Sequence, residues 1–189
     1  MLEFSILLCA YLIGSIPFGL IFMSILEDRD PRQEGSRNIG MSNVMRLSGF
    51  IPGVFTLIGD LGKGWLCVWW ATEVMPSTFL VSLSALMVVL GHCHSAFIDF
   101  QGGKGVATTA GAILALAVTP FLWLALIWAA IRFLTGNSGA ASIAAALITP
   151  LLIWLMLDIY LWIFLLISIL VLFRHRQNFQ EFFTKSILQ

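Results

Sequence analysis

Charged residues are scarce in this chain, and their scarcity excludes a soluble globular protein. Only 11% of the 189 residues are Asp, Glu, Lys or Arg, whereas about 25% is usual in soluble domains. Hydrophobic residues make up 59% of the chain and the mean hydropathy is +0.96, which leaves too little polar surface to face water. We therefore expect an all-α integral membrane protein.

The sequence also lacks an excess of charge of one sign, and it has little cysteine. Ten basic and ten acidic residues cancel, which gives no argument for binding nucleic acid or for a polybasic membrane anchor. Cys9, Cys67 and Cys93 lie in apolar runs without CxxC spacing, so we expect three small core residues and no disulfide framework. His92 and His94 are two residues apart and would point to different helix faces, so we expect no metal site.

Long apolar runs predict seven transmembrane helices. The first run is about 25 residues long and lacks a positive region before it, so it predicts a retained span and not a signal peptide. Helices of about 30 residues would be about 45 Å long, so the runs at 106–134 and 143–173 are split at Pro120 and Asp158. The predicted spans cover about 2–26, 50–72, 78–98, 106–119, 121–134, 143–157 and 159–173, in a single domain of residues 1–189.

The basic residues predict the orientation of these spans. Nine of the ten end or follow spans one, three, five and seven: Arg29, Arg32, Arg37, Arg46, Lys104, Arg132, Arg174, Arg176 and Lys185. The tenth, Lys63, falls within span two. The opposite ends carry Glu3, Glu73 and Asp158 and no basic residue. By the positive-inside rule the N-terminus is outside and the C-terminus is cytoplasmic. Five spans, with both long runs left whole, would give the same sides, so the charges favour seven spans only slightly.

The connector after the first span has the composition of an anion-binding loop. Residues 34–46, EGSRNIGMSNVMR, contain two glycines, two serines, two asparagines and two arginines. Such a backbone turns tightly and offers N–H, hydroxyl and amide donors, for which phosphate is the natural ligand. Ser42 or Asn43 is placed to N-cap a helix whose first N–H groups face the same ligand, with Arg46 one turn further on. A plain polar loop between two helices is the alternative interpretation.

A second glycine-rich segment, GGKGVATT at 102–109, opens the predicted fourth span. Glycines around Lys104 before a helix start let main-chain N–H groups and an ammonium group converge on one anion. The spacing is not that of a P-loop and no strand precedes it, so we exclude nucleotide hydrolysis. The alternative is a flexible hairpin with a cytoplasmic lysine.

The third segment, FRHRQN at 173–178, leaves the last predicted span. A basic flank that stops membrane transfer explains its arginines but not His175 and Asn178. Those two are three residues apart, so on a continued helix they share a face and converge on one ligand. His175 is there a candidate general base or a donor to a bound oxyanion.

Two charges fall inside the second predicted span. Asp60 and Lys63 are three residues apart, and each charge costs roughly 2.5–3.5 kcal/mol in the middle of a membrane helix. We expect a mutual ion pair that offsets part of this cost and turns this side of the helix toward a polar bundle interior.

Five motifs in one order resemble the bacterial PlsY family of acyl-phosphate-dependent glycerol-3-phosphate acyltransferases. They are GSIPFG at 14–19, GSxNIGxSNVxR at 35–46, GDxxKG at 59–64, GH at 91–92 before FQGGKGVAT at 100–108, and RHRxN at 174–178. The resemblance implies an enzyme of the bacterial inner membrane that transfers a fatty acyl group from acyl phosphate to the 1-position of glycerol 3-phosphate. Lysophosphatidic acid and inorganic phosphate are the implied products. No cofactor is implied, and contact with the enzyme that makes acyl phosphate is an expected partnership.

The resemblance also implies which residues form the site, on the cytoplasmic side. Phosphate and the acyl donor are bound by Ser36, Asn43 and Arg46, glycerol 3-phosphate by Gly102, Gly103 and Lys104, with His175 and Asn178 completing the catalytic set. Further substrate-binding candidates are Asn38, Gly40, Ser42 and Ser142.

The expected chemistry needs little more than positioning and electrostatics. Phosphate is a good leaving group once cations hold its charge. We favour a route in which the phosphate accepts the proton of the attacking hydroxyl, with His175 as the alternative base. The chain departs from the family pattern at Arg37, where the family has Gly, at 41–42, at 136–141 and after Asn178. The alternative function is therefore that of a divergent relative that binds or transports a phosphorylated lipid precursor without acyl transfer.

Overall fold

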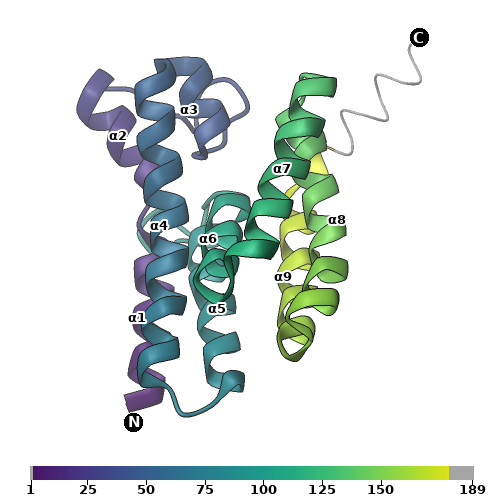
Figure 1. Cartoon of the computed structure of the whole chain (residues 1–189). Helices are drawn as coiled ribbons and strands as arrows, with labels where there is room; N and C mark the ends of the chain where they lie inside the picture. The colour runs from purple at the N-terminus through teal and green to yellow at the C-terminus, as the bar shows by residue number, and fades with distance from the viewer. Residues whose placement is uncertain (1, 179–189) are drawn as a thin grey trace.

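The structure is a computed structural model that describes residues 2–178 (Figure 1). All regular elements in that range are helices, which confirms the all-α prediction for these residues. Their bounds are α1 (Leu2–Ser15), α2 (Phe18–Glu27), α3 (Met41–Ser48), α4 (Phe50–Val74), α5 (Thr78–Cys93), α6 (Val106–Leu116), α7 (Val118–Thr135), α8 (Ser138–Met156), the 3-10 helix η1 (Asp158–Tyr160) and α9 (Leu161–Arg174).

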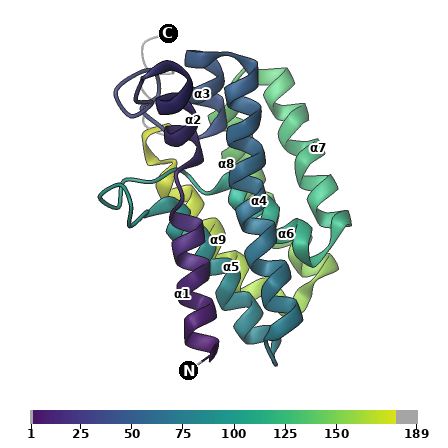
Figure 2. The ribbon, with the colours of Figure 1, turned by 90° about the vertical axis from the view of Figure 1, so that its left-hand side faces the viewer.

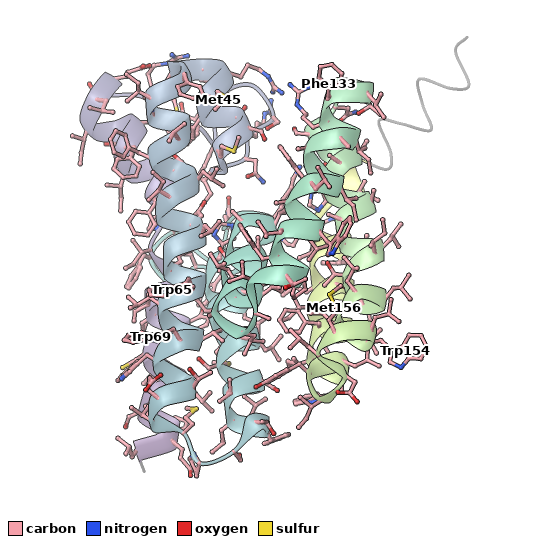
Figure 3. The ribbon with its side chains drawn as sticks, in the orientation of Figure 1. Met45, Trp65, Trp69, Phe133, Trp154 and Met156 are labelled. Carbon is pink, nitrogen blue, oxygen red and sulfur yellow. The ribbon has the colours of Figure 1, made fainter. Side chains whose placement is uncertain are left out.

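Four helical stretches are long and apolar enough to cross a membrane. They are Leu2–Glu27, in which α2 follows α1, and α4, α7 and α8, while α5 and α6 are shorter apolar helices. Large apolar side chains cover the outer surface: Phe133 is 88% exposed, and Trp154, 58% exposed, points away from the packed helices (Figure 3). Lipid tails are as apolar as these side chains, so their exposure fits a protein embedded in a bilayer.

The helix breaks differ in detail from the sequence pattern. The break expected at Pro120 lies at Ala117, whose extended backbone separates α6 from α7. Pro120 stands in the first turn of α7, where its missing N–H would have had no helical partner. At Asp158 the chain does turn, through η1, before α9 begins.

The first apolar run is interrupted in its middle. Ser15 ends α1 and Phe18 begins α2, because Pro17 has no N–H to continue the helical pattern. The carbonyl oxygen of Ile16, at this break, accepts a hydrogen bond from Lys63 Nζ at 2.8 Å. The same Nζ lies 2.9 Å from Asp60 Oδ1, so the predicted ion pair inside α4 is confirmed.

Small residues let the helices approach closely. A Cβ at Gly14 would overlap the backbone of Val88, which places α1 directly against α5. A Cβ at Gly111 would likewise overlap the backbone of Leu61, which places α6 against α4. Van der Waals contact over such close surfaces is the main attraction between helices in lipid.

Two of the three cysteines are core residues as predicted. Cys67 and Cys93 are buried among the packed helices. Cys9 is exposed on the outer face of α1, so the prediction of a core position is wrong for this residue. An apolar run in a membrane protein supplies both core and lipid-facing positions, and composition does not separate the two.

The helices are arranged so that the three polar segments, residues 34–46, 102–109 and 173–178, come close together. Figure 1 shows α2, α3 and the α7–α8 turn at the upper end, and the N-terminus, the α4–α5 connection and the α8–α9 turn at the lower end. In Figure 2, α1 stands in front with α2 and α3 above it. In Figure 2 the α5–α6 connection and the described end of α9 lie at a lower level than α3, and residues of all three segments line one pocket.

Candidate active site

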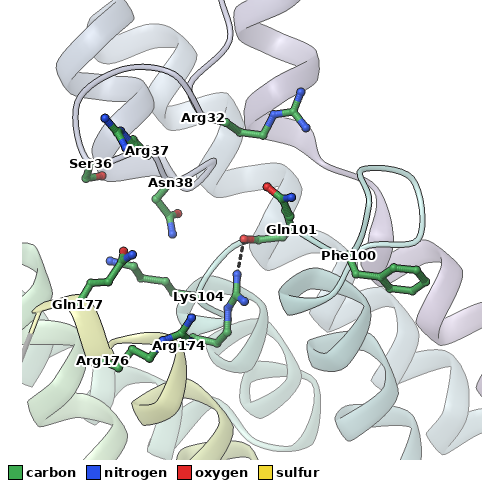
Figure 4. A pocket seen from close by; sticks show the side chains of 11 residues that line it. Arg32, Ser36, Arg37, Asn38, Phe100, Gln101, Lys104, Arg174, Arg176 and Gln177 are labelled. Atoms are coloured by element: carbon green, nitrogen blue, oxygen red, sulfur yellow. Dashed lines mark hydrogen bonds between the residues drawn. The ribbon is translucent and has the colours of Figure 1, made fainter.

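A basic pocket of about 310 Å³ lies where the three segments meet (Figure 4). It is lined by Arg32, Ser36, Arg37, Asn38, Phe100, Gln101, Gly102, Lys104, Arg174, Arg176 and Gln177. Five of these side chains are cationic, and no carboxylate is among the lining residues that the structure describes. Such a concentration of one charge sign attracts an anion, and guanidinium groups match the geometry of phosphate.

The loop from α2 to α3 is folded around one buried side chain, that of Asn43. Its Oδ1 accepts a hydrogen bond from the backbone N–H of Ser36 at 2.8 Å. Its Nδ2 lies 3.0–3.1 Å from the carbonyl oxygens of Pro31, Glu34 and Asn38. Asn43 is only 2% exposed, so this amide holds the loop from beneath while Ser36 and Asn38 face the pocket.

The predicted N-cap of this helix is wrong. Gly40 is the N-cap of α3 and makes no side-chain cap, so the helix begins at Met41, before Ser42 and Asn43. The physical reason is that the Asn43 amide is engaged by the loop and is not free to cap a helix end. Asn38 instead accepts a hydrogen bond from the backbone N–H of Gly40 at 2.8 Å, which closes the turn into α3.

Arginines form ion pairs with three acidic residues in and beside the loop, Glu27, Asp30 and Glu34. Arg29 forms ion pairs with Glu27 and Glu34, and Arg32 lies 2.7 Å from the Asp30 carboxylate. The hydrogen bonds from Arg32 lower the pKa of Asp30 below its usual range. Asp30 thus offsets the charge of Arg32, and the net positive charge of the pocket wall comes from its other four cations, Arg37, Lys104, Arg174 and Arg176.

The Gly102–Lys104 turn is held from two sides. On the α5 side, the N–H of Gly103 donates to the carbonyl oxygen of His92 at 2.9 Å. On the α9 side, the Arg174 guanidinium donates to the carbonyl oxygens of Gly103 at 3.0 Å and Gly102 at 2.7 Å, the latter in Figure 4. These three hydrogen bonds fix the turn beside the pocket.

The ammonium group of Lys104 links this turn to the end of the chain that the structure describes. Lys104 Nζ donates to Asn178 Oδ1 at 2.6 Å, so the second and third polar segments are joined at the pocket. The next residue, Gly105, has a φ of +87° and is the N-cap of α6. Residues with a Cβ rarely adopt that backbone, which explains a glycine directly after the lysine.

His175 is buried one residue beyond the end of α9 and is 2% exposed. Its Nδ1 lies 2.7 Å from the carbonyl oxygen of Val171, which only accepts, so in the neutral ring Nδ1 carries the hydrogen and Nε2 the lone pair. Burial lowers the pKa of His175 to about 4, and the charges of Lys104 and Arg174 act in the same direction. The ring is therefore neutral at pH 7.

The buried His175 ring makes folding stability depend on pH. An unfolded histidine has a pKa of about 6.5 and takes up a proton between pH 7 and pH 5. The folded ring does not, because its pKa is about 4, so this stabilisation is complete above pH 6.5 and declines below it. The expected decline at pH 5 is about 2 kcal/mol. Thermal midpoints at pH 7.5 and pH 5 should therefore fall more in the wild type than in His175→Gln, and equal falls would contradict this prediction.

Several predicted site residues do meet. Ser36, Asn38, Gly102 and Lys104 line the pocket, and Asn178 joins it through Lys104. The predicted residues that lie outside the pocket wall are Gly40, Ser42, Asn43, Arg46, Gly103, Ser142 and His175.

Ser142 and Arg46 both lie outside the pocket wall, in different surroundings. Ser142 is buried on α8, where its hydroxyl oxygen accepts a hydrogen bond from Trp128 Nε1 at 3.0 Å. Arg46 is exposed on α3.

Other pocket residues were not predicted from the sequence. They are Arg32, Phe100, Gln101, Arg174, Arg176 and Gln177. Arg174 and Arg176 belong to the third segment, but a basic flank after a membrane span is enough to explain arginines at these positions. Arg32 carries no local signal, since a basic residue in a connector is expected by the positive-inside rule alone.

Within residues 2–178, no three His, Cys, Asp or Glu side chains come together as a candidate metal-ion site. The donors that converge are guanidinium, ammonium, amide and hydroxyl groups, which bind anions. The fold and the pocket thus define a class of protein: a helical membrane protein with a cationic site for phosphate-like groups.

Comparison with known proteins identifies the family. The sequence pattern of the family described as glycerol-3-phosphate acyltransferase matches residues 4–185. A Burkholderia mallei protein of that name is 38% identical over 91% of this chain and 87% of its own length. One from Cupriavidus pinatubonensis is 41% identical over 94% of this chain and 91% of its own length. The chain belongs to the glycerol-3-phosphate acyltransferase family.

The fold is that of PlsY, described as an integral membrane glycerol 3-phosphate acyltransferase. Its crystal structure in the glycerol 3-phosphate form has a TM-score of 0.93 and 31% identity, covering 98% of this chain and 94% of that one. The lysophosphatidic acid form has a TM-score of 0.91 and 30% identity, covering 98% and 93%. A membrane location and membership of the PlsY family therefore hold for this chain.

Proposed function

We propose that this protein transfers a fatty acyl group from acyl phosphate to the 1-position of glycerol 3-phosphate. The products are lysophosphatidic acid and inorganic phosphate. The observation that carries the proposal is the pocket formed by all three polar segments, with five cationic side chains and no carboxylate among its described lining residues. Both substrates carry a phosphate group, and such a site holds phosphate charge before and after transfer.

The reaction divides between the two phosphates. The 1-hydroxyl oxygen of glycerol 3-phosphate attacks the acyl carbon, the bond from that carbon to the phosphate oxygen breaks, and the hydroxyl proton passes to the departing phosphate. Lys104, beside Asn178, holds glycerol 3-phosphate, and the arginines of the pocket stabilise the leaving phosphate. His175, with its Nε2 lone pair, is the alternative proton acceptor.

The proposed setting is the bacterial inner membrane, with seven spans and the pocket on the cytoplasmic side. The stretch α1–α2 is the first span, and α4 to α9 supply the other six in order, within a single domain. Two observations support this proposal: the basic residues of the sequence, and the gathering of the polar segments in one part of the molecule. An enzyme that makes acyl phosphate would supply the donor from that side.

Release of inorganic phosphate tests the proposal. Purified protein in detergent is given palmitoyl phosphate, with and without glycerol 3-phosphate, beside an active family member under the same conditions. Phosphate release that requires glycerol 3-phosphate, with lysophosphatidic acid formed in equal amount, is the expected result. No release from a folded sample, with the other protein active, would contradict acyl transfer.

The alternative is binding or transport of a phosphorylated lipid precursor without acyl transfer, and one observation favours it. Arg37 lines the pocket with a φ of +55°, where the family pattern has a glycine, so a bulky cation occupies a backbone position suited to glycine.

Arg37→Gly separates the two functions. If the protein is an enzyme, we expect the variant to keep turnover within about threefold of wild type, because the family pattern has a glycine at this position. Its thermal stability should be equal or higher, since the positive φ costs roughly 1 kcal/mol in a residue with a Cβ. The assay is the same phosphate release. Activity that appears only in the variant would establish the wild type as a binding protein.

A further inference from the structure

Three buried ionisable side chains lie outside the pocket and have no role in the proposed chemistry. Asp60 and Lys63 on α4 and His92 on α5 have side chains only 2–4% exposed. Asp60 Oδ1 lies 2.9 Å from Lys63 Nζ and 3.3 Å from His92 Nδ1. Apolar residues in place of a buried ion pair are often equally or more stabilising, so helix packing alone does not account for this cluster.

One end of the cluster is anchored at the break between α1 and α2. Lys63 Nζ donates to the carbonyl oxygen of Ile16 at 2.8 Å, and it lies 5.6 Å from the centre of the Phe18 ring. The ammonium group is therefore fixed by a carbonyl, an aromatic face and a carboxylate at once.

The other end of the cluster contacts the Gly102–Lys104 turn. A Cβ on Gly103 would overlap Nε2 of the His92 ring, and a Cβ on Gly102 would overlap the His92 carbonyl oxygen. The Gly103 N–H donates to that same carbonyl oxygen. Asp60 thus faces one nitrogen of the His92 ring, and the other nitrogen faces Gly103.

The contacts form a continuous path from α4 to the pocket. Lys63 pairs with Asp60, and Asp60 lies beside Nδ1 of His92. His92 lies against the two glycines, whose carbonyl oxygens accept hydrogen bonds from Arg174. The residue that follows the glycines is Lys104, whose Nζ reaches the pocket. A shift of the His92 ring would move the turn and the ammonium group with it.

We propose that Asp60, Lys63 and His92 are positioning residues that set the Gly102–Gly103 turn and thereby the place of the Lys104 ammonium group. This inference rests on the proposed function, because it gives Lys104 the task of holding glycerol 3-phosphate. It adds a buried support, on α4 and α5, to a site whose wall comes from the connecting segments and the end of α9.

Two variants test the support, with a matched control. Asp60→Asn and His92→Gln keep the approximate shape of each side chain, and Ser84→Ala changes another buried polar residue of α5, bonded to the Cys67 carbonyl oxygen and not to the turn. The readouts are KM for glycerol 3-phosphate, kcat, and backbone hydrogen exchange of segment 99–106. In the first two variants KM should rise at least tenfold, kcat should change less than threefold, and exchange should quicken. In Ser84→Ala all three should stay at the wild-type values.

KM and hydrogen exchange together separate failure of this inference from failure of the proposed function. Folded Asp60→Asn and His92→Gln proteins with wild-type KM and wild-type exchange would overturn the positioning role. A wild type without acyl transfer would overturn the proposed function, and quicker exchange in the variants would still support positioning. If Asp60→Asn does not fold, Asp60→Asn combined with Lys63→Met removes both charges together and carries the same expectations.

Discussion

Replacing Lys104 by alanine is expected to lower glycerol-3-phosphate-dependent phosphate release by about 100-fold or more. Its Nζ lies 2.6 Å from Asn178 Oδ1 at the wall of the basic pocket, so it is placed before the substrate arrives. Because Lys104 is proposed to hold glycerol 3-phosphate, most of this loss should appear as a higher KM: removing one partner of a hydrogen-bonded charge pair costs about 2–5 kcal/mol, or roughly 30-fold to several-thousand-fold in affinity. Initial rates at saturating palmitoyl phosphate, over a range of glycerol 3-phosphate concentrations, measure both kcat and KM.

Two matched variants show whether the effect belongs to this ammonium group. Arg132→Ala removes a cation from the last turn of α7, outside the pocket wall, and should leave the rate unchanged. Lys104→Arg keeps the charge but replaces a compact ammonium by a planar fork, so an intermediate rate is expected. A Lys104→Ala protein within threefold of the wild-type rate would show that the pocket does not act through this residue.

Asn43→Asp is expected to lower phosphate release to a similar degree, although Asn43 does not line the pocket. The carboxylate still accepts from the Ser36 N–H but cannot donate to the carbonyl oxygens of Pro31, Glu34 and Asn38. Each buried group left unpaired costs about 1–3 kcal/mol, and the new negative charge faces oxygen atoms. We expect the α2–α3 loop to open and phosphate release to fall by about 100-fold or more. Limited proteolysis of segment 28–40 and the phosphate assay measure the two effects.

Ser48→Ala is the matched control, because Ser48 lies on the same helix as Asn43 and its hydroxyl donates to Glu27 and not to segment 28–40. It should leave both proteolysis and turnover near wild-type values. A fully active Asn43→Asp protein with a protected loop would mean that the loop is held by contacts other than the amide.

The helical fold could be predicted from the sequence because lipid permits few other structures. A backbone in hydrocarbon must satisfy its own hydrogen bonds, so long apolar runs predict helices. The breaks were harder to place, because tertiary packing decides them. Ala117 carries no sequence signal for a break, whereas Pro120, which does, is accommodated in the first turn of α7.

The site could be predicted only as far as local patterns reach. Ser36, Asn38 and Lys104 lie in glycine-rich or amide-rich segments whose composition indicates anion binding, and they line the pocket. The contact of Arg174 with the Gly102–Gly103 turn joins segments about 70 residues apart, which no local pattern reveals. The resemblance implies that Asn43 binds phosphate, whereas the structure shows its amide bonded to the backbone of the loop, which a sequence pattern does not reveal.

The residues that line the pocket are synthesised at widely separated times. Its first lining residue is Arg32 and its last is Gln177, so 145 residues of synthesis separate the two. At about 5–20 residues per second, roughly 7–30 s pass between them. Until Arg174 at the end of α9 has been synthesised, the arginine that holds the glycine turn is absent. A growing chain is therefore expected to lack the complete pocket until its last described residues have been made.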